Sequence, residues 1–225
     1  MSAVAPMVWK NIDNASFYDE MPMADFMDHA VQAGIAKGED LEHIKGLILQ
    51  SKSILEVGTG YGRVLKYILQ LGFDGLLSAV ERNAHYAGSC KKQFGSRVNI
   101  YNEDVLEWKE DIKCDLILWM WSSISEFQPQ EQANLISNLS KALSKSGSLI
   151  VDVITSASKA NLELSQECAY YHIRGESGYQ EDVYMPSVSE VLAYASSCFR
   201  GHRLTPYETK NGVSRTIIQL FDPCD

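Results

Sequence analysis

The sequence predicts an α/β fold built on a doubly wound, mostly parallel sheet of seven strands with helices on both faces. Between residues 53 and 154, short apolar segments alternate with amphipathic ones, as strands alternate with helices in such a sheet. The apolar segments lack the polar–apolar alternation of half-exposed strands, which indicates that both faces of the sheet are covered. A chain of 225 residues suffices for one such domain with an extension and an insertion.

The first 51 residues are expected to form an N-terminal helical cap. The segment "DFMDHAVQAG" carries an apolar helical stripe that ends at Gly34, and "EDLEHIKGLILQ" carries a second one. Residues 52–154 then form the core of the domain. Its predicted strands are 53–57, 76–81, 97–102, 114–121 and 148–154. Its predicted helices are 61–72, 83–94 and 128–147, the last beginning near Pro129 and ending at Gly147.

The pattern changes after residue 154. Residues 155–186 are expected to form a hairpin insertion, with two strands in 168–185 around the turn "GESG". Residues 187–225 predict a helix capped by Ser187 and two closing strands, "RGHRLTPYE" and "SRTIIQLF", joined by a turn that contains "KNG".

A glycine-rich turn, "EVGTGYG", joins the first core strand to the next helix and is the main candidate binding site. Gly58, Gly60 and Gly62 can adopt positive φ and let backbone N–H groups approach a ligand at a helix N-terminus. A phosphate-binding P-loop would need Lys-Ser/Thr after the last glycine, and a dinucleotide motif would need glycine where Arg63 stands. Glu56 suits instead a ligand that carries a cationic group.

Four motifs in order make the segment 53–154 resemble the class I S-adenosylmethionine-dependent methyltransferases, whose sheet is Rossmann-like. The motifs are "LEVGTGYGR", "AVERN", "IYNEDVLEW" and "CDLILWMWSSISEF", followed by a glycine turn and strand in "LSKSGSLIVDV". The resemblance implies S-adenosyl-L-methionine as the cofactor and Glu81 as the partner of the ribose hydroxyls. It implies that Asp104 and Val105 recognise the adenine edge, although Glu103 is a neighbouring candidate and Asp104 could simply cap a turn.

The same resemblance extends to other cofactor contacts. "FYDEM" is similar to an N-terminal segment that covers the methionine end of the cofactor. The expected cofactor-binding residues are Tyr18, Glu56, Gly58, Thr59, Gly60, Gly62, Arg63, Glu81, Arg82, Asp104, Val105 and Trp119. For Arg63, a charge on the helix surface is the alternative. We expect no metal ligands, because no cluster of His, Cys and carboxylate residues has the spacing of a metal site.

The acceptor side is less defined, because Trp119 and Trp121 stand where smaller residues are commoner in the family. Because they lie two residues apart on a predicted strand, their side chains should point the same way, with Met120 on the opposite face. They could pack in the core, or they could form an aromatic wall beside the sulfonium or a cationic acceptor. Trp121, Ser122, Tyr171 and Arg174 are the expected substrate-binding residues, with Tyr18 and the hairpin covering the acceptor. Of the histidines, His172 alone is placed to act as a base, and the others, including His29, are expected at the surface.

The predicted reaction is methyl transfer from S-adenosylmethionine to a small-molecule acceptor, at N or O, by in-line displacement. A protein methyltransferase and a non-catalytic S-adenosylmethionine-binding module remain alternatives, and Arg63 argues against an NAD-linked oxidoreductase. The net charge of -9 and pI of about 5.1 disfavour nucleic acid as a partner.

Compartment and assembly are predicted from what the sequence does not contain. Five cysteines without CxxC spacing indicate free thiols in a reducing compartment. No signal peptide and no apolar run long enough to span a membrane is visible, so we expect a cytoplasmic protein that does not bind membranes. The oligomeric state is left open, with a homodimer among the alternatives.

Overall fold

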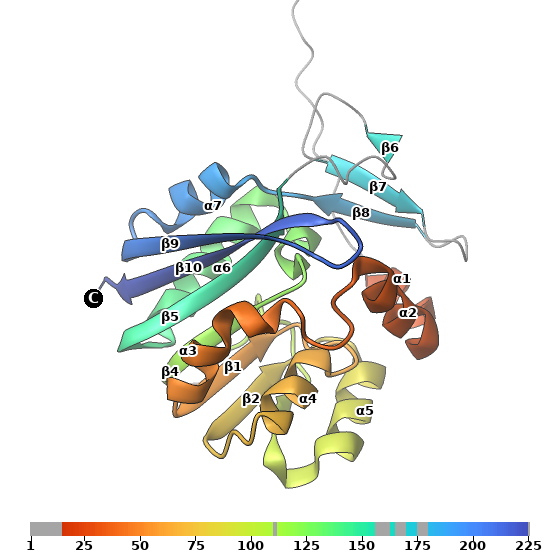
Figure 1. The fold of residues 1–225 in the computed structure, drawn as a ribbon, viewed down its shortest axis with the longest axis horizontal. Coiled ribbons are helices and arrows are strands. Elements are labelled where there is room, and N and C mark those ends of the chain that lie inside the picture. Colours follow the sequence, from red (N-terminus) through yellow and green to blue (C-terminus); the bar gives the residue numbers. More distant parts are fainter. Residues whose placement is uncertain (1–14, 110–111, 156–162, 165–169, 175–179, 225) are drawn as a thin grey trace, which may run out of the picture.

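The computed structural model describes the chain over residues 15–109, 112–155, 163–164, 170–174 and 180–224, and in residues 15–16, 163–164, 170–174 and 180–182 it describes the backbone alone. The main feature is a seven-stranded sheet, as predicted, with the order β3-β2-β1-β4-β5-β10-β9 (Figure 1). Its strands are β1 (Ser53–Val57), β2 (Leu76–Val80), β3 (Asn99–Tyr101), β4 (Cys114–Trp119), β5 (Leu143–Ile154), β9 (Phe199–Glu208) and β10 (Ser214–Pro223). The first five strands along this order are parallel, and β10 runs antiparallel to both of its neighbours.

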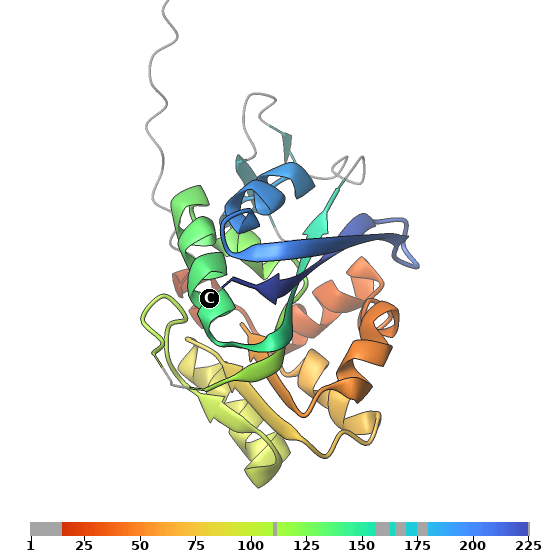
Figure 2. The ribbon, with the colours of Figure 1, turned by 90° about the vertical axis from the view of Figure 1, so that its left-hand side faces the viewer.

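Helices cover both faces of the sheet, as the apolar strands predicted (Figures 1 and 2). The α-helices are α1 (Ala15–Glu20), α2 (Met23–Ala33), α3 (Lys45–Gln50), α4 (Arg63–Gln70), α5 (Ala84–Phe94), α6 (Pro129–Lys141) and α7 (Val188–Ala195). Short 3-10 helices are η1 (Leu41–Ile44), η2 (Gly95–Arg97) and η3 (Ser123–Glu126). Side chains of α3, α4 and α5 pack on one face, and side chains of α6 and α7 pack on the other.

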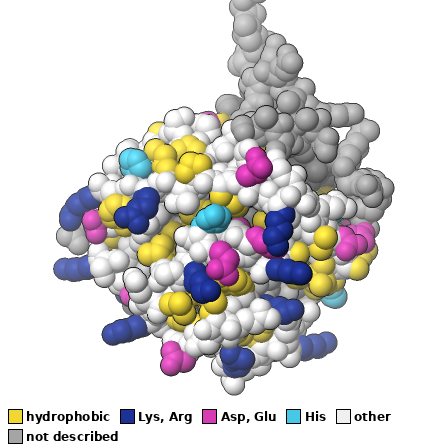
Figure 3. Space-filling model, viewed as in Figure 1, with side chains coloured by type: hydrophobic (Ala, Val, Ile, Leu, Met, Phe, Trp, Pro, Cys, Tyr) yellow, Lys and Arg dark blue, Asp and Glu magenta, His cyan; other side chains and the backbone are white. Residues whose placement is uncertain are grey.

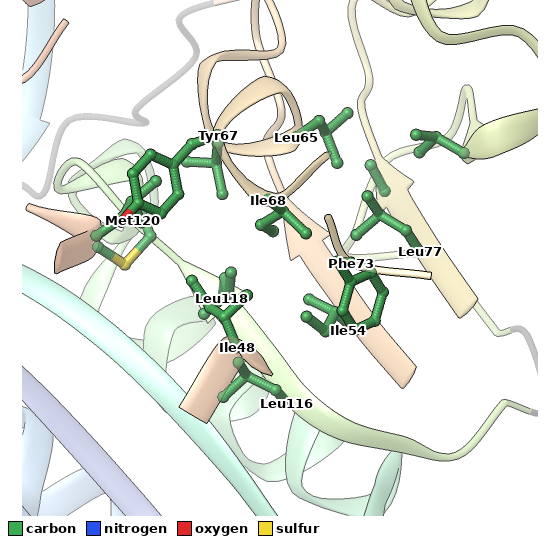
Figure 4. Packing of buried hydrophobic residues seen from close by; sticks show 14 of the residues in the cluster. Ile48, Ile54, Leu65, Tyr67, Ile68, Phe73, Leu77, Leu116, Leu118 and Met120 are labelled. Carbon is green, nitrogen blue, oxygen red and sulfur yellow. The ribbon is translucent and has the colours of Figure 1, made fainter. Parts of the chain in front are cut away.

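Alternation along the strands divides the core into these two layers. Leu116 and Leu118 face α3 and α4, where they meet Ile48 and Ile68 (Figure 4). The residues that alternate with them on β4, Ile117 and Trp119, face α6 instead. Successive side chains of a strand point to opposite faces, so one apolar strand supplies both layers.

Local signals explain where the helices begin and end. The side chain of Asn83 accepts hydrogen bonds from the N–H groups of His85 and Tyr86 and so caps α5. Ser187 caps α7 by accepting from the N–H of Glu190, as predicted. Gly34 ends α2 with a φ of 75°, in the left-handed region that favours glycine.

The predicted end of the helix at Gly147 is wrong. The helix α6 ends at Lys141, and β5 already begins at Leu143, which pairs with Cys114 of β4. The register then shifts, so Leu116 pairs with Ser148 and the intervening residues form an irregularity in the strand. A Cβ at Gly147 would lie 2.9 Å from the carbonyl oxygen of Cys114, so this glycine permits the close approach of two strands.

A second, three-stranded sheet contains the predicted hairpin. β7 (Tyr170–Arg174) and β8 (Gln180–Tyr184) pair antiparallel, as expected, and β6 (Glu163–Leu164) adds a strand that the sequence did not predict. The turn between β7 and β8 lies outside the described residues. The closing strands β9 and β10 are joined by a turn at Thr209–Val213 that contains Gly212, in agreement with the "KNG" signal.

Candidate active site

Two adjacent cavities open at the carboxyl ends of β1, β2 and β4, where open parallel sheets bind ligands. The smaller has a volume of about 100 Å³ and the larger about 430 Å³. They share Tyr18, Phe26, Gly58, Gly60, Ser123 and Glu126 as lining residues. The smaller cavity extends along the ends of β2 and β3, and the larger one extends toward the end of β5 and the start of β10.

The glycine turn forms the boundary between the cavities. Gly58, Gly60 and Gly62 have φ values of 70°, 51° and 82°, so each adopts the left-handed conformation that the sequence predicted for this turn. A Cβ at Gly60 would lie 2.7 Å from the ring of Phe26, and one at Gly62 would lie 2.7 Å from the ring of Phe94. The turn therefore requires glycine both for its backbone conformation and for close packing against α2 and α5.

Glu56, at the end of β1, lines the larger cavity and is 3% exposed. Its carboxylate accepts a hydrogen bond of 2.7 Å from the hydroxyl of Thr59. Burial raises the pKa of Glu56 to about 8, against the opposite effect of the Thr59 hydrogen bond. The side chain could hold a cationic group, whose charge would compensate for the lost solvation of the carboxylate.

Glu81, at the end of β2, lines the smaller cavity and is held by two backbone donors. Its two carboxylate oxygens accept hydrogen bonds of 2.8 Å from the N–H groups of Gly60 and Asn83. Burial raises the pKa of Glu81, and these two hydrogen bonds oppose the rise. Each oxygen of a carboxylate has two acceptor sites, so the group can still accept from a ligand hydroxyl.

The other end of the smaller cavity contains the residues after β2 and β3. Arg82, Glu103, Asp104 and Val105 all line it. Asp104 also accepts a hydrogen bond of 2.9 Å from the N–H of Leu106, so it caps a turn as well as facing the cavity. Glu103 and Asp104 therefore remain alternative partners for a ligand at this end.

Trp119 and Trp121 do not point the same way, contrary to the prediction. β4 ends at Trp119, and the chain then takes positive φ at Trp121 (53°) and Ser122 (57°). This turn separates the two indoles: Trp119 lies in the core against Phe127 and lines the smaller cavity, whereas Trp121 lines the larger one.

Two polar atoms beside the smaller cavity are buried without a hydrogen-bond partner among the described residues. They are the indole Nε1 of Trp119 and the hydroxyl of Ser123, and both residues line the cavity. Buried polar groups in native proteins nearly always have a partner, so water or a polar ligand in the cavity would have to supply one. A nucleoside has the hydroxyls and ring nitrogens that could pair with them.

Arg63 is buried, so the alternative prediction of a charge on the helix surface is wrong. It is 6% exposed and forms a bidentate ion pair with Asp40, with N–O distances of 2.6 and 2.8 Å. A third hydrogen bond reaches the carbonyl of Ile35. Its guanidinium lies 5.8 Å from the ring centroid of Trp121, and the residue lines the larger cavity. The ion pair fixes α4 to the segment before η1.

Aromatic side chains from α1, α2 and α5 cover the two cavities. Phe26 stacks on Trp121 at 5.2 Å and contacts the rings of Tyr18, Tyr61 and Tyr86. The hydroxyl of Tyr18 donates a 2.6 Å hydrogen bond to Glu126, which joins α1 to η3 across the shared wall. Tyr18 was predicted at this place, whereas Phe26 was not, because on its helical stripe it looks like an ordinary core residue.

A buried ion pair that sequence reasoning missed lies at the far end of the larger cavity. Arg215 of β10 binds Asp152 of β5 with an N–O distance of 2.6 Å, and the two side chains are almost completely buried. Arg215 lines the cavity and also donates to the hydroxyl of Ser122. An acid in the apolar segment "SLIVDVI" was a usable signal, because a buried carboxylate needs a partner.

The remaining predicted residues lie on the hairpin. Tyr171, His172 and Arg174 belong to β7, but their side chains lie outside the described part of the structure. His29, which was expected at the surface, is half-buried and lines the larger cavity. Within the described residues, no group of three or more His, Cys, Asp and Glu side chains could hold a metal ion.

Comparison with known proteins found a matching family model and solved structures of similar fold. Residues 54–147 match the family model Methyltransf_25, a methyltransferase domain. The fold is similar to that of the glycopeptide N-methyltransferase MtfA complexed with S-adenosyl-L-homocysteine, with a TM-score of 0.67 and 14% identity over 82% of this chain and 89% of that one. A second similar structure is the CcbJ methyltransferase from Streptomyces caelestis (TM-score 0.61, 13% identity, 94% of this chain and 97% of that one). The DhpI-SAM-HEP complex has a TM-score of 0.60 and 17% identity over 91% of this chain and 92% of that one. A comparison with curated proteins gave no significant match.

Proposed function

We propose that this chain transfers the methyl group of S-adenosylmethionine to a small-molecule acceptor in the larger cavity. Its fold and its domain family identify it as a class I S-adenosylmethionine-dependent methyltransferase. The single observation that carries the proposal is the pair of adjoining cavities at the glycine turn. One has the polar groups that a nucleoside requires, and the other provides a separate, larger space on the far side of the turn.

The smaller cavity fits the adenosine part of S-adenosylmethionine. Glu81 would accept hydrogen bonds from the ribose hydroxyls, and Asp104 or Glu103 would face the adenine together with Val105 and Arg82. The unpartnered Nε1 of Trp119 and hydroxyl of Ser123 support this assignment, since a nucleoside could satisfy both.

At the glycine turn, the larger cavity is lined by the residues that would hold the amino acid part of the cofactor. Glu56 would face the cationic amino group, with Thr59 and the backbone of Gly58 to Gly62 beside it. Tyr18 would cover this end from α1. Arg63 lines the same wall, but its charge is compensated by Asp40, so it would shape the site through Trp121.

When bound, S-adenosylmethionine would supply an electrophilic methyl carbon for transfer to an acceptor atom with a lone pair, with a thioether as the leaving group and a proton lost from the acceptor. The chain contributes alignment and the exclusion of water. Phe26 packs over Gly60 and against Trp121, and the Tyr18–Glu126 hydrogen bond closes the wall between α1 and η3. His172 remains the candidate base, and the acceptor atom, N or O, stays open.

A small acceptor is favoured over a protein because the larger cavity is lined mostly by buried and half-buried groups from several elements, α1, α2, β8 and β10 among them. The similar structures include a methyltransferase that acts on a glycopeptide and a complex of DhpI with SAM and HEP, which supports the same size class. On β7, Tyr171 and Arg174 would contribute to the cover of this space, with Trp121 and Ser122 on its wall.

The expected surroundings follow from the charge and the fold. Lys and Arg side chains are scattered among Asp and Glu on the face in Figure 3, and the net charge is -9, so we do not propose nucleic acid as a partner. Among the described residues, no helix is long and apolar enough to cross a membrane. The five cysteines without paired spacing support a reducing, cytoplasmic setting.

The test is incubation of the protein with S-adenosylmethionine labelled in the methyl group, in parallel with a small-molecule extract and with a protein extract. Label in small molecules alone supports the proposal, and label in proteins alone supports the protein methyltransferase. Tight binding of S-adenosylhomocysteine without label in either extract would leave the non-catalytic binding module as the function.

A further inference from the structure

Arg215 forms a buried ion pair, and its side chain also lines the larger cavity. It lies near the start of β10, where its backbone pairs with Ile154 at the end of β5. Its exposed fraction is 2%, and its side chain contributes to the larger cavity. The position is far from the glycine turn in sequence but at the same edge of the sheet.

Two of the three guanidinium nitrogens are fixed by the protein. Nε donates to both carboxylate oxygens of Asp152 at 3.2 and 3.0 Å, and Nη2 donates to Asp152 at 2.6 Å and to the hydroxyl of Ser122 at 2.7 Å. Asp152 itself is held by the N–H of Trp121 and the hydroxyl of Tyr207. The guanidinium therefore has one orientation.

The third nitrogen, Nη1, makes no hydrogen bond to any residue that the structure describes. A guanidinium carries five N–H donors, two of them on this nitrogen. Donors left unpaired beside a largely apolar cavity are costly unless water or a ligand accepts from them. The fixed orientation and the unpaired donors together form a built site for an oxygen atom.

The charges around the cavity define which kind of oxygen fits. Asp152 compensates Arg215, and Asp40 compensates Arg63, so neither arginine offers a net positive charge. Glu56 and Glu126 also line the cavity. Among the described lining residues, a carboxylate or phosphate entering this space would meet no Lys or Arg that lacks an acidic partner, whereas a neutral carbonyl or hydroxyl oxygen needs only the donor.

The residue paired with Arg215 across the two strands, Ile154, is apolar. Ile154 at the end of β5 forms a small hydrophobic cluster with Val183 and Met185, and all three line the larger cavity. A ligand group bound at Arg215 would therefore place its hydrocarbon part against this cluster.

We infer that Arg215 is a specificity-determining residue: its Nη1 donates a hydrogen bond to a neutral carbonyl or hydroxyl oxygen of a methyl acceptor whose apolar part packs on Ile154, Val183 and Met185. The inference rests on the proposed function, because it assigns the larger cavity to the acceptor. Asp152 and Ser122 act as positioning residues for the guanidinium, and Trp121 is held in the same network.

The experiment uses apolar amines and phenols as methyl acceptors. Each is tested in three forms that carry a primary amide, a carboxylate or a methyl group at the same distance from the atom that is methylated. The methyl donor is labelled, and kcat/KM is measured for each form. The wild-type protein should prefer the amide form over both others by about 10-fold, as expected for one charge-assisted hydrogen bond. A preference for the carboxylate form, or equal rates for the amide and methyl forms, would overturn the inference.

Variants separate binding of the oxygen from a structural role. Arg215→Lys should lose most of the preference for the amide over the methyl form, while the Kd for S-adenosylhomocysteine stays within about twofold. Ser122→Ala leaves the ion pair intact and should weaken the preference in the same direction, which keeps the test available if Arg215→Lys does not fold. Arg203→Lys, an exposed arginine on β9, is the matched control and should behave as wild type. An unchanged preference in Arg215→Lys, or in Ser122→Ala where only that variant folds, contradicts the inference.

The small-molecule extract is run beside the acceptor panel. Label in the extract but in no amide-bearing panel member would reject the acceptor class inferred here and leave the proposed function standing. No label in either would reject the proposed function itself.

Discussion

Glu56 predicts a pH dependence of cofactor binding that is unusual for a carboxylate. Burial raises its pKa to about 8, so at neutral pH most of the free protein carries a protonated, uncharged Glu56. If the side chain binds the cationic amino group of the cofactor as a carboxylate, binding must remove that proton. The apparent affinity is then reduced by the fraction of protein that is ionised before binding.

The size of the effect follows from this pKa. For a pKa of about 8, about 1% of Glu56 is ionised at about pH 6 and about 9% at about pH 7, so the Kd for S-adenosylhomocysteine should fall about 10-fold between these values. The assay is isothermal titration calorimetry at several pH values between about 5.5 and 7, in buffers of different ionisation enthalpy. Uptake of close to one proton by the buffer should accompany binding.

Glu56→Gln is the matched variant, because it keeps the shape and removes the titration. The Kd of this variant for S-adenosylhomocysteine should resemble that of wild type at the lowest pH tested. It should not fall with rising pH as the Kd of wild type does. The pKa of Glu81 is also raised by burial, but Glu81 is present in both proteins, so the difference between them isolates Glu56. A flat Kd in wild type, or an equal slope in Glu56→Gln, would refute the reasoning.

The same group should affect stability in the opposite direction. Since the folded pKa lies above the unfolded value of 4.5, the folded state holds more protons between the two values. The stabilisation is complete below about pH 4.5 and is lost as the pH rises through about 8, with a slope of up to about 1.4 kcal/mol per pH unit. Urea unfolding of wild type and Glu56→Gln across this range measures the difference, which should grow with pH in favour of the variant.

Three further predictions concern the cofactor site and metals. Trp119→Phe removes the unpartnered indole N–H at the smaller cavity and should weaken S-adenosylhomocysteine binding about 2- to 10-fold. Trp108→Phe removes another indole N–H without a partner among the described residues, and Trp108 lines neither cavity, so equal losses in the two variants would contradict the assignment. Gly60→Ala places a Cβ 2.7 Å from the Phe26 ring at a φ of 51° and should abolish binding and lower Tm, whereas Gly88→Ala has open space in the interior of α5 and should raise stability by about 0.5–1 kcal/mol. Methyl transfer should survive treatment with EDTA, and a loss restored by Mg²⁺ or Zn²⁺ would indicate a metal site.

The geometry of the site around the glycine turn could be predicted because its residues are close in sequence and tied to backbone conformation. Gly58, Gly60 and Gly62 need positive φ, and Glu56 and Glu81 stand at the ends of adjacent parallel strands. Both requirements leave marks within a short stretch of sequence: glycine at fixed spacing, and an acid directly after an apolar run. The sheet itself was predictable for the same reason, since each strand and helix has its own local pattern.

The far part of the larger cavity could not be predicted in the same way. Trp121 was assigned to a strand because the apolar run continues past Trp119, but the chain leaves the sheet there through two residues of positive φ. Nothing in "WMWSSIS" marks that turn, because neither residue is a glycine. The conformation is held by Asp152, which accepts from the N–H of Trp121 and whose carbonyl accepts from the N–H of Ser122.

These two parts also divide the charge of the cavity, which bears on how two ligands could occupy it together. At the glycine turn the charge of Arg63 is matched by Asp40, so the carboxyls of Glu56 and Glu126 would remain to pair with the cationic end of the cofactor. At the far end the charge of Arg215 is already matched by Asp152, so it offers a donor without attracting an anion. A cationic cofactor and a neutral acceptor would thus be drawn to opposite ends of one cavity, and neither would compete for the site of the other.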